Sequence, residues 1–113
     1  MIIMLKNIDA ETVLNLGNQV SYQKGQVVSK TLAQNGAISL TLFAFDKGEE
    51  ISSHESGGDA MVTCLDGEGK ITIDGTSYML NEGESIVMPA KKPHAVYASE
   101  QFKMFLVVVF PVD

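Results

Sequence analysis

Two stretches of this 113-residue sequence decide its fold: residues 48–67 read GEEISSHESGGDAMVTCLDG, and residues 83–98 read GESIVMPAKKPHAVYA. Each combines a short apolar run with glycine- or proline-containing turn signals, and each carries one of the two histidines of the chain, His54 and His94. On both sides of these stretches the same pattern continues, from residue 37 to residue 110. Short apolar runs cut at regular intervals by turns are typical of β-sandwiches and barrels. We therefore predict an all-β protein.

The positions of the turn signals predict the individual elements. Asp74 and Gly75 form a strong hairpin signal, the segment DGEG at residues 66–69 is expected to end a strand, and residues 89–93 are expected to form a loop. Strands are predicted over residues 37–45, 60–65, 70–74, 77–80, 85–88, 94–98 and 102–110.

Residues 1–36 carry a weaker pattern. We expect a helical turn over residues 8–16, with Asp9 as its N-cap, followed by strands near Val20 and over residues 27–33. At this length the whole chain, residues 1–113, is expected to form one domain.

The strand predicted over residues 102–110 is apolar on both faces. Leu106 and Val108 alternate with Val107 and Val109, so both faces of the strand require burial. One barrel interior covers only one of them. We expect the other face to pack against a second sheet, most economically one from an identical subunit, which predicts a homodimer.

The composition excludes several classes of function. The chain has 14 acidic residues and 8 lysines but no arginine, with a net charge of −6, which argues against nucleic-acid binding. The longest apolar stretch, residues 104–112, is too short to span a membrane. The chain begins MIIMLK, without the basic start and cleavage site of an export signal, and contains one cysteine, Cys64. We expect a cytoplasmic protein with no membrane partner.

The two quoted stretches resemble the paired motifs of the cupins, written G(X)5HXH(X)3,4E(X)6G and G(X)5PXG(X)2H(X)3N. The first motif matches residues 48–67 and the second matches residues 83–98, with the hairpin over residues 70–81 between them. The resemblance implies a single-domain antiparallel double-stranded β-helix, the jelly-roll barrel of that family.

The resemblance also implies a divalent-metal site, of which this chain keeps only part. In the family, two histidines and a glutamate of the first motif and one histidine of the second hold the metal. His54 and His94 match two of these positions, whereas Ser56 stands at the second histidine and Ala60 at the glutamate. The second motif has Lys91 in place of its internal glycine and Ala98 in place of its asparagine.

A carboxylate could complete a site built on two histidines, as in the non-haem iron oxygenases. Asp59 is the candidate third ligand for Fe, Mn, Zn or Ni, although strand alternation places it on the outer face and its position after two glycines suits a turn residue. The same alternation places Glu55 on the face opposite to His54. A metal-free pocket is therefore a full alternative to a metal site.

Three functions remain open at this stage. The first is a small-molecule binding or sensing barrel with a pocket formed by His54, Ser56, Cys64 and His94. The second is a metal-dependent enzyme such as a dioxygenase or isomerase, and the third is an association module whose function is its dimer. Cys64 is expected on the inner wall of the barrel as a small buried residue.

Overall fold

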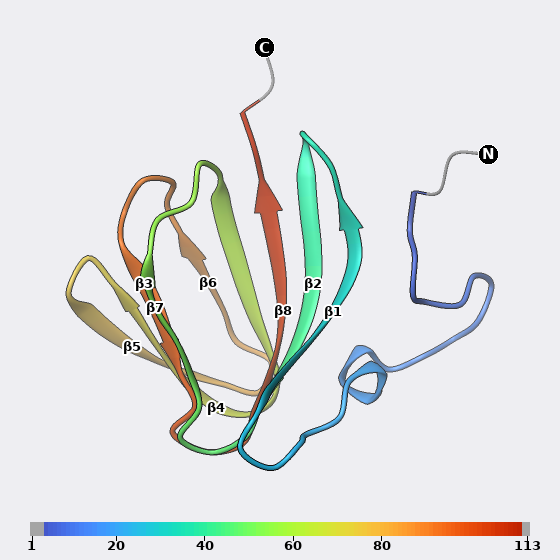
Figure 1. Cartoon of the computed structure of the whole chain (residues 1–113), viewed down its shortest axis with the longest axis horizontal. Helices are drawn as coiled ribbons and strands as arrows, with labels where there is room; N and C mark the ends of the chain where they lie inside the picture. The colour runs from blue at the N-terminus through green and yellow to red at the C-terminus, as the bar shows by residue number, and fades with distance from the viewer. Residues whose placement is uncertain (1–3, 112–113) are drawn as a thin grey trace.

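A computed structural model describes residues 4–111 of the chain (Figure 1). Residues 1–3 and 112–113 lie outside the described part of the chain. They include the two ends of the predicted domain, the start of the MIIMLK segment and the last residue of the apolar stretch over residues 104–112. Within residues 4–111 the chain forms one 3₁₀ helix, η1 (Leu16–Gln19), and eight β-strands. The strands are β1 (Val27–Gln34), β2 (Ile38–Phe45), β3 (Glu50–His54), β4 (Asp59–Ile73), β5 (Thr76–Asn81), β6 (Ser85–Met88), β7 (His94–Tyr97) and β8 (Phe102–Val109).

The strands form a curled antiparallel sheet, as the all-β jelly-roll prediction requires (Figure 1). Its order is β1-β2-β8-β4-β7-β3, and both β5 and β6 pair with β4. β4 is the central element, because its first part pairs with β8 and β6 and its last part pairs with β5 and β7. The fold class predicted from the sequence is confirmed.

The prediction of two strands where the structure has β4 was wrong. Residues 66–69 do not form a turn; the strand continues through them with a bulge between Cys64 and Asp66. The glycines serve close packing instead. A Cβ on Gly67, which has a φ of +76°, would lie 1.6 Å from the carbonyl oxygen of Gln101, and one on Gly69 would meet the ring of Phe102 at 2.6 Å. Close approach of two backbones is a second reason for glycine inside a strand.

The Asp74-Gly75 hairpin between β4 and β5 is confirmed. Both residues have positive φ, 48° and 86°, which is the backbone conformation of a type I′ turn. Ile73 and Thr76 pair directly across it. The strands predicted near β1, β2, β6, β7 and β8 also form, whereas β3 was not predicted because its sequence, EISSH, contains one apolar residue.

The main core lies inside the curl of the sheet. Ala60, Val62 and Cys64 of β4 all point into it, as strand alternation predicted. They pack with large buried side chains, which are Phe45 of β2, Phe102 and Met104 of β8, and Ile71 from the last part of β4.

The N-terminal segment differs from the prediction. No helix forms over residues 8–15; instead η1 begins at Leu16, and its N-cap is Asn15, whose side chain accepts a hydrogen bond from Gly17 N at 2.9 Å. The N-cap predicted at Asp9 was therefore wrong. The strand predicted near Val20 was also wrong, since no strand forms between η1 and β1, and Val20 instead belongs to a second apolar cluster. Tertiary packing overrides the weak local pattern here.

This second cluster covers part of the outer face of β2 and β8. Leu42 of β2 belongs to it, and Phe105 of β8 and Leu16 of η1 pack against it. Polar contacts hold the segment in place, because Tyr22 donates a hydrogen bond to Asp66 and Lys103 Nζ donates one to Gly17 O at 2.6 Å. In Figure 1 this segment lies beside β1, outside the curl. The chain thus covers Phe105 with its own N-terminal segment, without a second subunit.

The rest of that outer face is open. Met61, Val87 and Val109 are 44%, 53% and 53% exposed. A cross-strand row links the covered part of this face to the open part, because Val107 is paired with both Leu40 and Met61, and Met61 with Val87. Leu40 packs against the second cluster, and the other three residues continue the row away from it. We call these four residues the outer row. The homodimer stays a prediction, and the outer row is the surface on which it depends. Over residues 4–111, no helix has the length and apolar character needed to cross a membrane.

Candidate functional site

A cavity of about 260 Å³ lies inside the curl of the sheet. Most of its wall is apolar and comes from strands on both sides, and its polar lining consists of His54, Glu55, Ser56 and His94. The apolar lining includes Phe43, Ile51, Met88, Val96, Met104 and Leu106. A concave, mostly apolar pocket with a few convergent polar groups is the usual form of a small-molecule site.

The two histidines meet because β3 and β7 are neighbours. His54 and His94 are directly paired across these antiparallel strands, and an irregularity between Ile51 and His54 sets that register. Their ring centroids lie 4.3 Å apart, with an interplanar angle of 68°. Their Nε2 atoms are 3.1 Å apart. His94 is 3% exposed, whereas His54 lies at the exposed end of β3.

Backbone carbonyls fix the tautomers of both rings. His54 Nδ1 lies 3.0 Å from Ser52 O, and His94 Nδ1 lies 3.2 Å from Lys92 O. A carbonyl oxygen only accepts hydrogen bonds, so each Nδ1 carries the hydrogen in the neutral ring. The Nε2 of each neutral ring is then an acceptor, and the two acceptors face each other.

Burial lowers the pKa of His94 below its ordinary value. The hydrogen bond to Lys92 O acts in the opposite direction, and the nearby His54 adds to the lowering. His94 is therefore neutral at pH 7. Two rings that both carry their hydrogen on Nδ1 cannot hydrogen-bond to one another through Nε2, so a hydrogen or a cation from another source would complete the pair.

Ser56 and Glu55 lie beside the histidines at the cavity. Ser56 Oγ accepts a hydrogen bond from Gly58 N at 3.2 Å, and Ser56 O accepts one from Lys91 N at 2.9 Å. Sequence reasoning placed Glu55 on the opposite face from His54 and missed it as a lining residue. That reasoning assumed that strand alternation continues, but β3 ends at His54.

The structure does not bring Cys64 to the cavity. Its side chain is buried in the main core, with Sγ 3.5 Å from both Asp66 O and Gly67 O. Burial is the main cause that raises the pKa of the thiol, to about 11. A thiol in this state is protonated at neutral pH and is a poor nucleophile or ligand.

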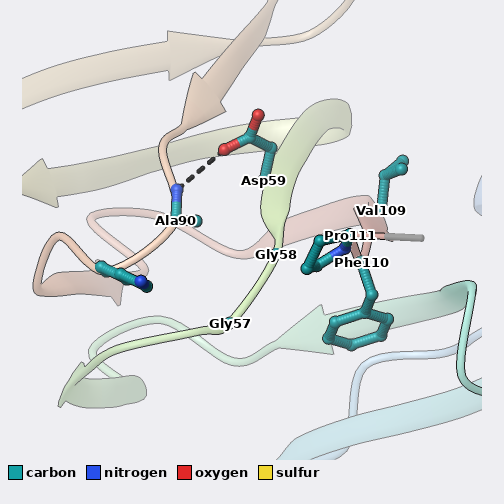
Figure 2. A pocket seen from close by; sticks show the side chains of 8 residues that line it. Gly57, Gly58, Asp59, Ala90, Val109, Phe110 and Pro111 are labelled. Atoms are coloured by element: carbon teal, nitrogen blue, oxygen red, sulfur yellow. Dashed lines mark hydrogen bonds between the residues drawn. The ribbon is translucent and has the colours of Figure 1, made fainter. Parts of the chain in front are cut away.

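Asp59 also lies apart from the histidines. Its Oδ1 accepts a hydrogen bond from Ala90 N at 2.8 Å, as Figure 2 shows. With Gly58, Val109 and Pro111 it lines a separate, open hollow of about 420 Å³ (Figure 2). Asp59, the first residue of β4, therefore holds the loop that follows β6, and it does not bond its own backbone as the predicted turn residue would.

The donor set does not fit a resident metal. Among residues 4–111, no group of three or more histidine, cysteine, aspartate and glutamate side chains is placed to hold a metal ion. Catalytic zinc sites use three protein ligands and structural ones use four, whereas His54 and His94 supply two. Ser56 and Ala60 line the cavity with a hydroxyl and a methyl group.

The cupin-domain family model matches residues 41–110, which include the strands and loops that form this cavity. The chain belongs to the cupin family. Its fold agrees with the double-stranded β-helix implied by the two motifs. No match was found among the curated proteins.

Solved structures support the same assignment. A conserved protein of unknown function from Streptococcus pyogenes is 48% identical to this cupin, with a TM-score of 0.95 and coverage of 97% of this chain and 96% of that one. A cupin superfamily protein from Desulfitobacterium hafniense DCB-2 is 34% identical, with a TM-score of 0.90 and coverage of 95% and 98%. A cupin 2 conserved barrel domain protein from Leptotrichia buccalis is 47% identical, with a TM-score of 0.84 and coverage of 85% and 47%.

Proposed function

We propose that this cupin binds a small, largely apolar molecule in the barrel cavity without a resident metal. The observation that carries the proposal is the cavity itself, in which an apolar wall surrounds the paired Nε2 atoms of His54 and His94. The apolar wall would stabilise the ligand by removing its surface from water, at about 25 cal/mol per Å². The histidines would orient it.

The donor set favours this function over a metal-dependent dioxygenase or isomerase. Such an enzyme uses its metal as a Lewis acid or an oxygen site and must hold it through several turnovers. His54 and His94 provide two imidazoles, and Asp59, the carboxylate that could add a third ligand, is bonded to Ala90 N instead. The enzyme hypothesis therefore needs a ligand that the described residues do not supply.

Methionine methyl groups allow a direct test. Met88 and Met104 line the cavity, whereas Met61 and Met79 are exposed and provide internal controls. With ¹³C-methyl-methionine protein and toluene or 4-methylphenol as probe, we expect the signals of Met88 and Met104 to shift saturably and those of Met61 and Met79 to stay fixed. Absence of shifts at millimolar concentrations of both probes would contradict the proposal.

A cavity-filling variant sharpens this test. Ala60→Leu adds three carbon atoms at the cavity wall and should abolish the shifts, while Val87→Leu, on the exposed outer row, should leave them unchanged. The free energy of unfolding of both variants is measured in parallel, because overpacking a buried site costs about 1–3 kcal/mol.

We further propose that a second copy of the chain covers the outer row. The row is apolar and free of charged residues, whereas the chain as a whole has a net charge of −6. Because each copy is acidic, two copies repel one another in most relative orientations. Contact through an uncharged sheet face keeps the carboxylates of the two copies apart. Face-to-face packing of two such sheets is a common arrangement in β-proteins.

The cytoplasm is the compartment that we propose for this protein. Cys64 is a free, buried thiol, and it is the only cysteine of the sequence. A single unpaired cysteine is the usual state in a reducing compartment. Fractionation of cells that express the protein, with a marker for each compartment, tests this assignment.

A further inference from the structure

We propose that the His54–His94 pair selects a ligand that carries a hydrogen-bond donor, such as a hydroxyl or N–H group, and rejects carboxylates. The inference rests on the proposed function and adds the chemical class of the ligand. Three observations carry it: the backbone carbonyl beside each Nδ1, the distance between the two Nε2 atoms, and the charges around the cavity.

The tautomers make the pair an acceptor. Ser52 O and Lys92 O each occupy the Nδ1 of one ring, at 3.0 and 3.2 Å, so the unsubstituted nitrogen of each neutral ring is Nε2. The two Nε2 atoms lie 3.1 Å from one another, and with the hydrogen of each ring on Nδ1 neither ring can donate to the other. Ser56 carries the hydroxyl of the cavity lining, and its Oγ accepts a hydrogen bond from Gly58 N rather than bonding to either ring.

The separation of 3.1 Å suits a shared donor. A hydroxyl or N–H group placed about 2.9 Å from each nitrogen completes a nearly equilateral triangle and shares its hydrogen in a three-centre bond. A group with two hydrogens could direct one toward each ring. A ligand without a donor would remove water from both acceptors and leave them unpaired. Binding sites reject analogues that lack a polar group for this reason, because an unpaired buried acceptor costs free energy.

The charges around the cavity disfavour anions. The one ionisable side chain that lines it besides the histidines is the acidic Glu55. Lys91 and Lys92 are exposed on the adjacent loop, and Lys91 lines the outer hollow rather than the cavity. Both lysines bond at these loops through their backbone, from Lys91 N to Ser56 O, from Lys92 N to Pro89 O and at Lys92 O with His94 Nδ1. A carboxylate would therefore meet two acceptors and a like charge, with no cation to pair it.

The cavity volume limits the size of the ligand. At about 260 Å³ it falls below the roughly 300–1,000 Å³ of sites for drug-sized molecules. A single substituted ring or a short branched chain with one donor fits this description. Such a molecule would place its donor at the histidines and its apolar part against Met88, Met104 and Leu106.

Three matched probes test the inference: 4-methylphenol, 4-methylanisole and 4-methylbenzoate. They share one ring and differ in carrying a donor, a methylated oxygen or an anion. Affinity is measured by the Met88 and Met104 methyl shifts at pH 8. We expect 4-methylphenol to bind at least about tenfold more tightly than 4-methylanisole, and 4-methylbenzoate to bind most weakly.

The outcomes separate this inference from the proposed function. Equal binding of 4-methylphenol and 4-methylanisole, or tighter binding of 4-methylbenzoate, would overturn the inference and leave the binding function standing. Absence of binding by all three, together with toluene, would remove both.

Ring ¹⁵N chemical shifts give an independent readout on the unmodified protein. We expect Nδ1–H tautomers for both histidines at pH 8, and a change at both Nε2 resonances when 4-methylphenol is added. An Nε2–H tautomer on either ring would overturn the inference.

A variant connects the selectivity to the pair. His54→Phe keeps a planar ring but removes one acceptor, so the ratio of 4-methylphenol to 4-methylanisole affinity should fall at least about threefold while 4-methylanisole still binds. Tyr97→Phe, on the outer face of β7, is the matched control and should keep the full ratio. An unchanged ratio in His54→Phe would contradict the role of the pair.

Discussion

The Nε2 atoms of His54 and His94 lie 3.1 Å apart because the two residues are paired directly across β3 and β7. The two strands differ in how many neighbours hold them. β7 also pairs with the last part of β4, which places Ile73 beside His94, whereas β3 pairs with β7 alone. The buried histidine thus belongs to the interior of the sheet and the exposed one to its edge, where a ligand would enter.

The stability of the protein is expected to fall as the pH decreases below about 6.5. Burial lowers the pKa of His94 in the folded state, so the unfolded chain binds a proton more readily than the folded one. The free energy of unfolding therefore rises with pH between the folded and unfolded pKa values of His94, and the contribution is fully present above the unfolded value. Urea unfolding from pH 5 to pH 8 measures this slope.

His94→Gln serves as the comparison for that slope. The variant cannot titrate, so its free energy of unfolding should depend less on pH over the same range. His54 lies at the exposed end of β3, and His54→Gln should retain most of the wild-type slope. An equal slope in wild type and His94→Gln would show that another group is responsible.

Gly67→Ala is expected to destabilise the fold by more than about 3 kcal/mol. The new Cβ would lie 1.6 Å from Gln101 O, so the backbones of β4 and β8 would have to separate. The positive φ of Gly67 adds a further cost of about 1–2 kcal/mol.

Gly75→Ala separates these two effects. Gly75 also has a positive φ, 86°, but a Cβ there meets no atom within 4 Å. Its free energy of unfolding should therefore fall only by the conformational cost of about 1–2 kcal/mol. Equal losses in the two variants, measured by urea denaturation, would contradict the close approach of β4 and β8 at Gly67.

The glycines of β4 also show how far the sequence could predict the fold. Turn residues at 74–75 and alternating apolar residues identify the hairpin and most strands, because those signals are local. Gly67 and Gly69 look like turn residues for the same local reason, but their cause is contact with Gln101 and Phe102, more than 30 residues away. Such contacts have no signature in the nearby sequence.

The candidate site divides in the same way. The motif spacing places His54 and His94 in one pocket, and the structure brings the two together. Strand alternation alone could not show that Glu55 lines the cavity, because the direction of the Glu55 side chain depends on where β3 ends. It also could not show that the N-terminal segment packs on Phe105, since tertiary burial decides that contact.

Asp59→Ala is expected to lower the free energy of unfolding by about 0.5–1.5 kcal/mol. The substitution removes the acceptor for Ala90 N and leaves one of two observed bonds between the loops, from Lys91 N to Ser56 O. Hydrogen exchange at the Ala90 amide should accelerate. Asp59→Asn keeps the Oδ1 acceptor and should retain most of the protection; fast exchange in that variant would mean that charge, not the hydrogen bond, holds the loop.

Ser56→His is expected to create metal binding, which we propose that the natural chain lacks. Ser56 lines the cavity beside the pair, at the position of the second histidine of the family motif, and a third imidazole would complete the three-ligand set of a catalytic zinc site. After loading with zinc and desalting, elemental analysis should find metal in the variant and substoichiometric metal in the wild type. Ser56→Ala is the control. One equivalent of retained metal in the wild type would contradict the metal-free proposal.

Val87→Lys is expected to weaken self-association. Val87 is 53% exposed and is paired with Met61 on the outer row, so a lysine folds without strain but places two like charges within a symmetric interface. Light scattering after size exclusion at micromolar concentrations should find a dimer for the wild type and a monomer for Val87→Lys. Tyr78→Lys, at a 44% exposed position on β5, provides a matched change of charge away from the outer row. A monomeric wild type would contradict the dimer. A loss of association in Tyr78→Lys alone would place the interface away from the outer row.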